Sequence, residues 1–308
     1  MITILMATYN GEKYVAEQIE SILCQTETRW RLIIQDDCSK DRTEAIVNKY
    51  AEKYPEKIKF VKSNVASGSA KANFFSMLKF SGSEYMMTCD QDDVWLPGKI
   101  EITLKKMWDL EKEFGSNKPL LVHTDLKTVD EKLNVVSDSF FSFQNLDSTR
   151  NRVNNILVQN IVTGCTMMVN RALLQLIDEI PEQAVIHDWW FALIAAAFGE
   201  IGFIKEPTIL YRQHTDNEIG AKNTETFHYN IMRFMKSKQV KSVIADSYLQ
   251  AESLLKIYDN KITESKLRII KEYKSLPKYN KIKRLKVINK YDFWKNSFFR
   301  KCGQILFM

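Results

Sequence analysis

The first 120 residues alternate short apolar runs with amphipathic runs of helical period, and this alternation limits the fold more than any other feature of the sequence. Residues 14–24 place Val15, Ile19, Ile22 and Leu23 on one face, and residues 42–54 repeat the pattern. Strand, helix and strand in succession build a parallel sheet covered by helices, so an α/β fold is predicted. The candidate strands are Ile2–Thr8, Trp30–Asp36, Ile58–Ser63 and Tyr85–Cys89.

The start of the second helix has a capping pattern. Asp41 is the expected N-cap, and Glu44, three residues later, completes a pair that resembles a capping box.

Beyond residue 118 the pattern becomes mixed, and the sheet is not expected to stay purely parallel. Strands are expected at Leu120–Thr124, Asn160–Val169 and Ile201–Tyr211, and helices at Arg171–Ile180 and His187–Phe198. From Thr224 onward long helical runs predominate, with Pro277 as their breaker. A domain is therefore expected at residues 1–220, with a nucleotide-binding half to about 120 and an acceptor half to 220, followed by a helical extension at 221–308.

Charge separates these two regions. Residues 231–308 carry 19 basic and 6 acidic side chains, a net of +13, whereas residues 1–230 carry a net of −7. An acidic body suits a divalent cation, and a basic tail suits an anionic surface. No secretory leader, spanning segment or Cys-x-x-Cys pair is visible, so a cytoplasmic protein with free thiols and only peripheral membrane contact is expected.

Polar groups follow three of the expected strands. Asp90, Asp92 and Asp93 come directly after Tyr85–Cys89, where oxygen ligands would hold Mg²⁺ or Mn²⁺ together with a diphosphate. The alternative is a solvated acidic turn before the helix that begins near Pro97. Asp36 and Asp37 follow the second strand and can accept hydrogen bonds from a nucleobase or ribose, although turn chemistry explains part of this segment.

The turn after the first strand, Thr8-Tyr9-Asn10-Gly11, adds small polar groups at the same edge. Tyr9 can stack on a base. Three polar turns after successive parallel strands predict a nucleotide site.

These residues carry a family resemblance. Ala7–Gly11, Gln35–Ser39 and Asp90–Asp93 resemble the N-terminal motifs of family 2 glycosyltransferases, which have the GT-A fold, a Rossmann-like and mostly parallel sheet flanked by helices. Asp90–Trp95, Asn160–Thr166 and His187–Trp190 further resemble the bacterial rhamnosyltransferase-like branch. The resemblance covers roughly residues 1–220.

The resemblance implies roles for individual donor-side residues. Asp37 would contact uracil or thymine, Asp90 the ribose or the metal, and Asp92 the metal directly, with His214 completing the metal shell. Donor contacts would also come from Thr8, Tyr9, Asn10, Lys71 and Gln91. A solvated loop is the alternative for Lys71 and for His214.

On the acceptor side, Asp188 matches the family's catalytic base, and its alternative is a helix N-cap. Trp189 and Trp190 would form an apolar wall against a sugar ring or pack in the core, and one of each is expected.

The tail has a surface-binding pattern. Lys278–Lys290 holds six cations among apolar residues and is followed by Tyr291, Phe293, Trp294, Phe298 and Phe299. This composition suits an anionic leaflet. A soluble helical cap is the alternative, and the acidic body argues against nucleic acid.

The sequence thus predicts an inverting glycosyltransferase that uses Mn²⁺ or Mg²⁺ in bacterial surface glycan synthesis, at the inner face of the membrane. By resemblance dTDP-L-rhamnose is the leading donor, UDP-hexoses are second, and the acceptor is a lipid-linked glycan or polysaccharide. A nucleotidyltransferase and a non-catalytic binding protein remain the alternatives, and a homodimer is left open.

Overall fold

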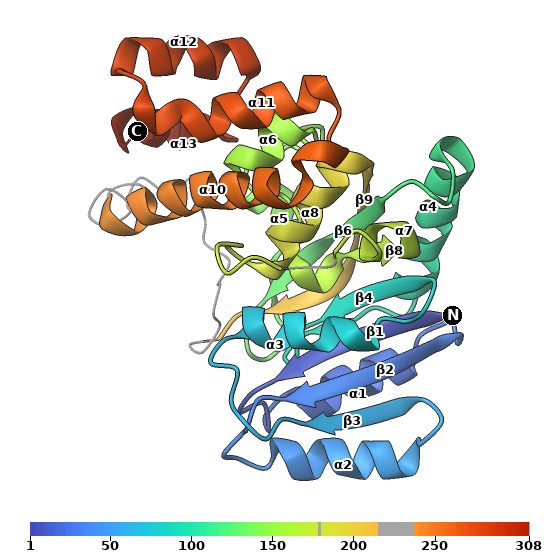
Figure 1. The fold of residues 1–308 in the computed structure, drawn as a ribbon. Helices are drawn as coiled ribbons and strands as arrows, with labels where there is room; N and C mark the ends of the chain where they lie inside the picture. Colours follow the sequence, from blue (N-terminus) through green and yellow to red (C-terminus); the bar gives the residue numbers. More distant parts are fainter. Residues whose placement is uncertain (178–179, 215–236, 308) are drawn as a thin grey trace. The chain divides into compact units, whose positions relative to one another are not determined.

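The computed structural model describes residues 1–177, 180–214 and 237–307 (Figure 1). Contacts divide the chain into two units, each considered over its described residues. The first comprises Met1–Phe140, Thr163–Leu176 and Gly202–Gly220, and the second comprises Phe141–Val162, Ile177–Ile201 and Ala221–Met308. The boundary expected at residue 220 lies outside the described residues.

The first unit is built around β-strands. In chain order they are β1 (Ile2–Thr8), β2 (Trp30–Asp36), β3 (Ile58–Lys62), β4 (Tyr85–Cys89), β5 (Val94–Trp95), β6 (Leu120–Val129), β7 (Val135–Ser137), β8 (Met168–Asn170) and β9 (Glu200–Arg212). The helices are α1 (Val15–Leu23), α2 (Thr43–Lys53), α3 (Ala70–Met77), α4 (Lys99–Phe114), α5 (Phe140–Phe143), α6 (Val153–Val158), α7 (Arg171–Leu174), α8 (His187–Phe198), α10 (Ser237–Tyr258), α11 (Glu264–Ser275), α12 (Lys281–Tyr291) and α13 (Phe298–Phe307). Single 3₁₀ turns are η1 (Leu78–Phe80), η2 (Gly164–Thr166), η3 (Asp259–Lys261) and η4 (Leu276–Lys278).

The strands form one sheet in the order β3-β2-β1-β4-β8-β6-β9-β5, with β7 paired to β6. Strands β1 to β4 are parallel, and β8 pairs antiparallel with both β4 and β6. The predicted α/β sheet with a mixed second half is therefore confirmed. The chain moves outward from β1 to β3 and returns on the other side of β1 as β4, so the carboxyl ends of β1, β2 and β4 meet at one edge.

The burial of β1 follows from its place in the sheet. The side chains of Ile4, Leu5 and Met6 in β1 have no exposed surface, because β1 lies between β2 and β4 in the middle of the parallel part. In Figure 1, α3 lies in front of these strands and α1 behind them.

Three local predictions are wrong. Arg42, not Asp41, is the N-cap of α2, and Glu44 pairs with Lys62 instead of reaching back to a cap. Asp41 instead accepts hydrogen bonds from the Thr43 amide (2.9 Å) and the Glu12 amide (3.0 Å).

The other two concern the segment after residue 160. Of the strand expected over Asn160–Val169, only Met168 and Val169 belong to a strand, β8, and the 3₁₀ turn η2 precedes it. The helix expected over Arg171–Ile180 ends at Leu174. Apolar residues of the expected strand are buried, as their pattern indicates, but without regular structure throughout: Ile161, Val162, Cys165, Met167, Met168 and Val169.

The second unit contains mostly helices, as expected for the end of the chain. Pro277 lies in η4 and separates α11 from α12. Among the described residues, no helix combines the length and the apolar composition that crossing a membrane requires.

Candidate active site

A clamp joins the turn after β1 to the turn after β4. The side-chain amide of Gln91 accepts a hydrogen bond from the Tyr9 amide (2.9 Å) and donates one to the Tyr9 carbonyl (2.9 Å). Gln91 is predicted to bind the donor, but both ends of its amide hold the backbone of Tyr9. Tyr9 itself is 51% exposed, so its ring is accessible to a ligand.

Gly11 makes room for this clamp. A Cβ atom at Gly11 would lie 2.2 Å from Oε1 and 2.6 Å from Cδ of Gln91, distances that non-bonded atoms do not adopt. The glycine is therefore required by a close side-chain approach.

The turn after β2 is held by Asp36. Its Oδ1 accepts hydrogen bonds from the Thr8 hydroxyl (3.0 Å) and the Ser39 hydroxyl (2.6 Å), and its Oδ2 accepts one from the Ser39 amide (2.8 Å). Thr8 is 1% exposed and its hydroxyl supports Asp36, so its predicted contact with a donor stays a prediction. Asn10, at a positive φ of 49°, accepts from the Lys40 amide and binds the same turn.

Asp37 lies beside this turn and faces the segment before α3. Its carboxylate accepts hydrogen bonds from the Ser67 amide (2.5 Å) and the Ser67 hydroxyl (2.9 Å). Ser69 caps α3 by accepting from the Ala72 amide, which places Lys71 in the first turn of that helix. The roles predicted for Asp37 and Lys71 toward a donor stay predictions.

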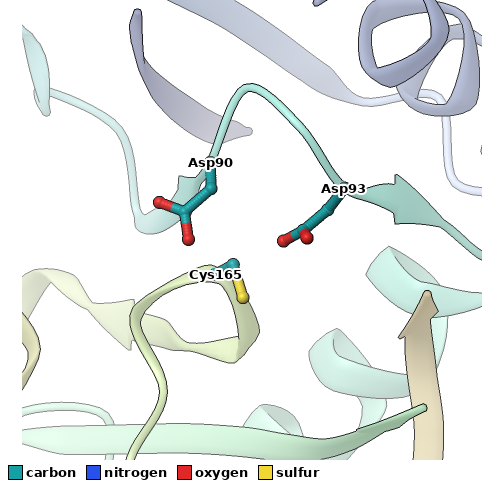
Figure 2. A group of neighbouring side chains, drawn as sticks. All are labelled: Asp90, Asp93 and Cys165. Atoms are coloured by element: carbon teal, nitrogen blue, oxygen red, sulfur yellow. The ribbon is translucent and has the colours of Figure 1, made fainter. Parts of the chain in front are cut away.

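The acidic turn forms a cluster with a residue from η2. Three potential ligand atoms lie within 4.8 Å of one another, one each from Asp90, Asp93 and Cys165. Figure 2 shows the three side chains gathered beneath the turn that joins β4 to β5. The sequence motif indicates the two carboxylates, but the thiol is missed because Cys165 is 72 positions away from Asp93.

Burial sets the electrostatics of this cluster. Asp93 has no exposed surface, and its pKa is raised well above the usual range, first by burial and then by the charges of Asp92 and Asp90. Burial likewise raises the pKa of the Cys165 thiol and lowers that of Lys99 to about 8. Burial therefore disfavours the charged forms of all three side chains.

Asp92 and His214, both predicted to bind the metal, lie in contact, and their metal role stays a prediction. Asp92 Oδ2 and His214 Nε2 lie 2.8 Å apart, and both side chains are mostly buried. The His214 ring stacks on Tyr14, with ring centroids 5.1 Å apart and an interplanar angle of 30°. The pairing of β5 with β9 brings these distant segments together, since Val94 lies opposite Leu210.

Arg212 supports this pair, and sequence reasoning missed it. Its Nε donates to the Asp92 carbonyl (2.8 Å), its Nη2 pairs with Glu17, and its guanidinium lies over the Tyr14 ring at 4.6 Å. Its position two residues before His214 is the one signal the sequence offers. Arg212 therefore holds the backbone at Asp92 in place.

Asp188 lies in the second unit, in the first turn of α8. The N-cap is Ile186, so the alternative of an N-cap role for Asp188 is wrong. Asp188 Oδ1 accepts a hydrogen bond from Asn160 Nδ2 (2.9 Å), and Asn160 is itself held by the amide and carbonyl of Val162. The Asn160 amide and the N-terminus of α8 both place partial positive charge beside this carboxylate.

The two tryptophans after Asp188 are buried. Trp190 has no exposed surface and lies beside Tyr258, so core packing accounts for it. Trp189 is 6% exposed and donates its indole N–H to the Ile156 carbonyl (2.6 Å). An acceptor contact therefore stays a prediction for Trp189 alone.

A known protein family matches the N-terminal part of this chain. The model of glycosyl transferase family 2 matches residues 3–176, more than half of the chain. The chain belongs to that family. It is therefore a glycosyltransferase, and the family resemblance seen in the three turns is confirmed.

Individual relatives of this family 2 glycosyltransferase differ in their donors. The dTDP-rhamnosyl transferase RfbG of Shigella flexneri is 25% identical over 76% of this chain and 80% of its own length. S. aureus TarS 1-349 in complex with UDP-GlcNAc has a TM-score of 0.57 and 20% identity over 94% of this chain and 78% of that one. A longer TarS chain is matched over 43% of its length.

The Pyrobaculum calidifontis mannosyltransferase PcManGT, solved with GDP-Man and Mn²⁺, has a TM-score of 0.52 and 16% identity over 94% of this chain and 84% of that one. At these identities the two structural likenesses show the fold alone, which is the predicted GT-A fold.

Proposed function

We propose that this chain is a metal-dependent, inverting glycosyltransferase that uses a nucleotide-sugar donor in the synthesis of a bacterial surface glycan. One observation carries the proposal: the turns after β1 and β4 are clamped together beside the carboxylates of Asp90, Asp92 and Asp93. The carboxyl edge of an open α/β sheet is where nucleotides bind. The exposed ring of Tyr9 supports a base-stacking role at this edge.

The residues of the acidic turn fit a divalent cation. Asp90, Asp92 and His214 offer the oxygen and nitrogen atoms that Mn²⁺ accepts, and carboxylates alone suit Mg²⁺. The buried Asp93 would gain negative charge only beside a bound cation, because burial raises its pKa. When bound, the cation would offset the charge that develops on the leaving diphosphate.

Asp188 is proposed as the general base. Asn160 holds its carboxylate, and the start of α8 favours the ionised form, which can take a proton. Asp188 would accept the proton of the acceptor hydroxyl as that oxygen attacks the anomeric carbon. The bond to the nucleotide diphosphate breaks on the opposite face with its electron pair, so a single displacement inverts the anomeric centre.

The leading donor is dTDP-L-rhamnose, with UDP-hexoses second. The name of the RfbG relative supports the first, and the TarS complex with UDP-GlcNAc supports a uridine donor. The acceptor is proposed to be a lipid-linked glycan or a polysaccharide, and the basic end of the chain would bind the anionic membrane surface where such acceptors lie.

Calorimetric titration tests the proposal with dTDP, UDP, GDP, dTDP-rhamnose and UDP-hexoses, each with and without Mn²⁺. Mn²⁺-dependent binding of dTDP-rhamnose above all other ligands is expected. Preference for a UDP-hexose would replace the donor but keep the class. Absence of nucleotide binding under every condition would refute the proposed reaction and favour a non-catalytic binding protein.

A further inference from the structure

Helix α13 exposes its apolar face. Residues at helical spacing along one side are exposed: Phe298 (75%), Phe299 (52%), Cys302, Ile305 (37%) and Leu306 (54%). The opposite side is buried and carries the polar residues Arg300 and Gln304. A surface helix of a globular protein normally has the reverse arrangement, with its apolar stripe toward the core.

Hydrogen bonds fix this orientation. The Arg300 guanidinium donates to the Gln144 carbonyl (2.6 Å) and to Gln144 Oε1 (3.0 Å). Gln304 donates to the Phe293 carbonyl (2.6 Å) and accepts from the Lys295 amide (3.0 Å). Turning the helix to bury its apolar stripe would break these bonds and leave partners without hydrogen bonds, which is costly.

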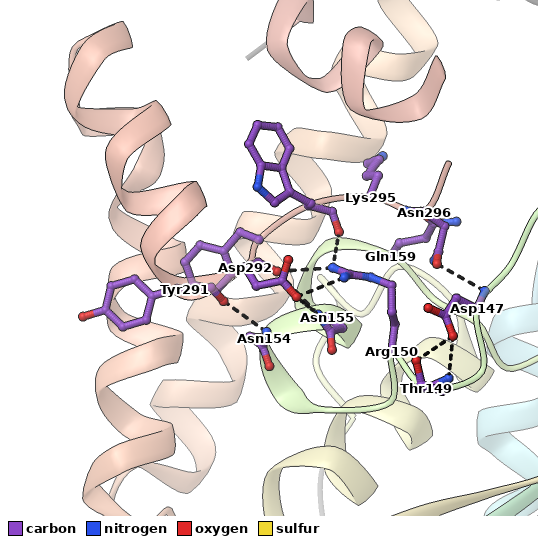
Figure 3. A network of polar contacts seen from close by, with 12 residues as sticks. Asp147, Thr149, Arg150, Asn154, Asn155, Gln159, Tyr291, Asp292, Lys295 and Asn296 are labelled. Atoms are coloured by element: carbon purple, nitrogen blue, oxygen red, sulfur yellow. Dashed lines mark hydrogen bonds and ion pairs between the residues drawn. The ribbon is translucent and has the colours of Figure 1, made fainter. Parts of the chain in front are cut away.

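The segment before α13 is pinned as well. Figure 3 shows Arg150 reaching Asp292 (3.0 Å), and Arg150 also donates to the Trp294 carbonyl (2.6 Å). Asn296 accepts from the Asp147 amide (3.2 Å) and donates its own amide to Gln159 (2.9 Å). The apolar face of α13 is therefore held outward by contacts on both sides of Ser297.

The stretch of chain that contains α13 is basic. Residues 278–308 carry nine Lys and Arg side chains and one acidic residue, Asp292, which pairs with Arg150. Four lysines of α12 are exposed, Lys281, Lys283, Lys286 and Lys290, and so is Ile282 (71%). Exposed apolar side chains and exposed lysines on the same stretch of chain are the composition of segments that lie in the interface of an anionic bilayer.

We infer that α13 is the membrane-docking element, with Phe298, Phe299, Ile305 and Leu306 inserted at the boundary of headgroups and acyl chains and the lysines of α12 on anionic headgroups. This inference rests on the proposed membrane location and assigns the apolar contact to α13, whereas the sequence indicates only a basic segment, Lys278–Lys290, and the aromatic residues that follow it. The predicted contribution of Phe293 is wrong, since that ring has no exposed surface.

A second copy of the chain fits this face less well. A helix of ten residues is about 15 Å long, so one face of α13 offers far less than the roughly 800 Å² per partner of a stable interface. Pairing two such regions would also bring like charges together.

Vesicle flotation of the full chain tests the inference. Phosphatidylcholine vesicles containing phosphatidylglycerol should bind the protein, and phosphatidylcholine alone should bind it weakly. The variant F298S/L306S should bind the anionic vesicles about tenfold or more weakly, because two large exposed side chains no longer leave water. The control V135S/V136S, two exposed apolar residues of β7, should bind like the wild type.

A fluorescent label gives a second measurement. In a Cys24→Ser background, Cys302 is the remaining exposed cysteine of the described residues, and it lies on the apolar face. An environment-sensitive dye on Cys302 should shift its emission to the blue when anionic vesicles are added. An unchanged emission spectrum with bound protein would place the contact elsewhere and overturn the inference.

Other outcomes would also decide whether α13 docks on membranes. Equal binding of F298S/L306S and wild type overturns the inference, and so does a dimer that this variant converts to a monomer without any vesicle binding. Equal binding to both lipid mixtures removes the role of the lysines. Nucleotide binding, measured in parallel, separates the two proposals: vesicle binding through α13 without nucleotide binding would refute the proposed reaction and leave the docking face intact.

Discussion

Substitution of Gly11 by alanine should release the clamp between Tyr9 and Gln91. The new Cβ would lie 2.2 Å from Gln91 Oε1, so the Gln91 side chain must move and lose both hydrogen bonds to Tyr9. Each bond contributes about 1 kcal/mol, so Gly11→Ala should lower the free energy of unfolding by about 2 kcal/mol. If Tyr9 contacts the nucleotide as proposed, nucleotide affinity should fall as well.

A double-mutant cycle makes this reasoning refutable. Gln91→Ala removes the same two bonds, so the double variant should be destabilised by about 2 kcal/mol and not by the sum of about 4 kcal/mol. Urea unfolding measures the four proteins of the cycle, and calorimetry measures their nucleotide affinity. Gly82→Ala is the matched control, because a Cβ there has no heavy atom within 4 Å. Additive losses would show that Gly11 and Gln91 act independently.

Three further outcomes are expected. Asp92→Asn should weaken Mn²⁺ and nucleotide binding together by about tenfold or more, because it removes a ligand charge beside His214; unchanged Mn²⁺ dependence in calorimetry would exclude Asp92 as a ligand. Asp188→Asn should reduce transfer by about 10² to 10⁴-fold while nucleotide affinity is kept, and Asn160→Ala should reduce it less; a matching loss of nucleotide affinity would argue against a base role. Acid should weaken the fold through His123, whose pKa burial lowers to about 3, because below about pH 6.5 the unfolded chain takes up a proton that the folded chain excludes. Between pH 7 and pH 5 this costs about 2 kcal/mol, so His123→Phe should show a smaller loss of unfolding free energy over that range, and an equal loss would refute the linkage.

Residues close in sequence made much of the first unit predictable. The bounds of β1, β2 and β4 coincide with the expected strands, because runs of apolar residues followed by polar turns specify them locally. The three turns could be assigned to one edge because the carboxyl ends of neighbouring parallel strands share that edge.

Apolar content alone misled the prediction after residue 160. Ile161, Val162 and Cys165 are buried as expected, but the Gly164 carbonyl accepts a hydrogen bond from the Thr88 hydroxyl (2.6 Å) in a 3₁₀ turn. Such a turn buries the same side chains without forming a strand. A run of apolar residues indicates burial, but the hydrogen-bond partners of the backbone decide whether the run forms a strand.

The sequence by itself determined the α/β body, the acidic turn and the basic character of the end of the chain, since these depend on periodicity, spacing and composition. Tertiary structure alone decided which side chains meet: Cys165 with Asp93, Arg212 with Asp92, and Gln91 with Tyr9. It also decided which face of α13 is exposed. The stripe of Phe298 and Leu306 is visible in the sequence, but Gln144, 156 residues before Arg300, supplies the buried partner that turns the stripe outward. The local sequence pattern defines the two faces of a helix, and long-range hydrogen bonds determine which face is exposed.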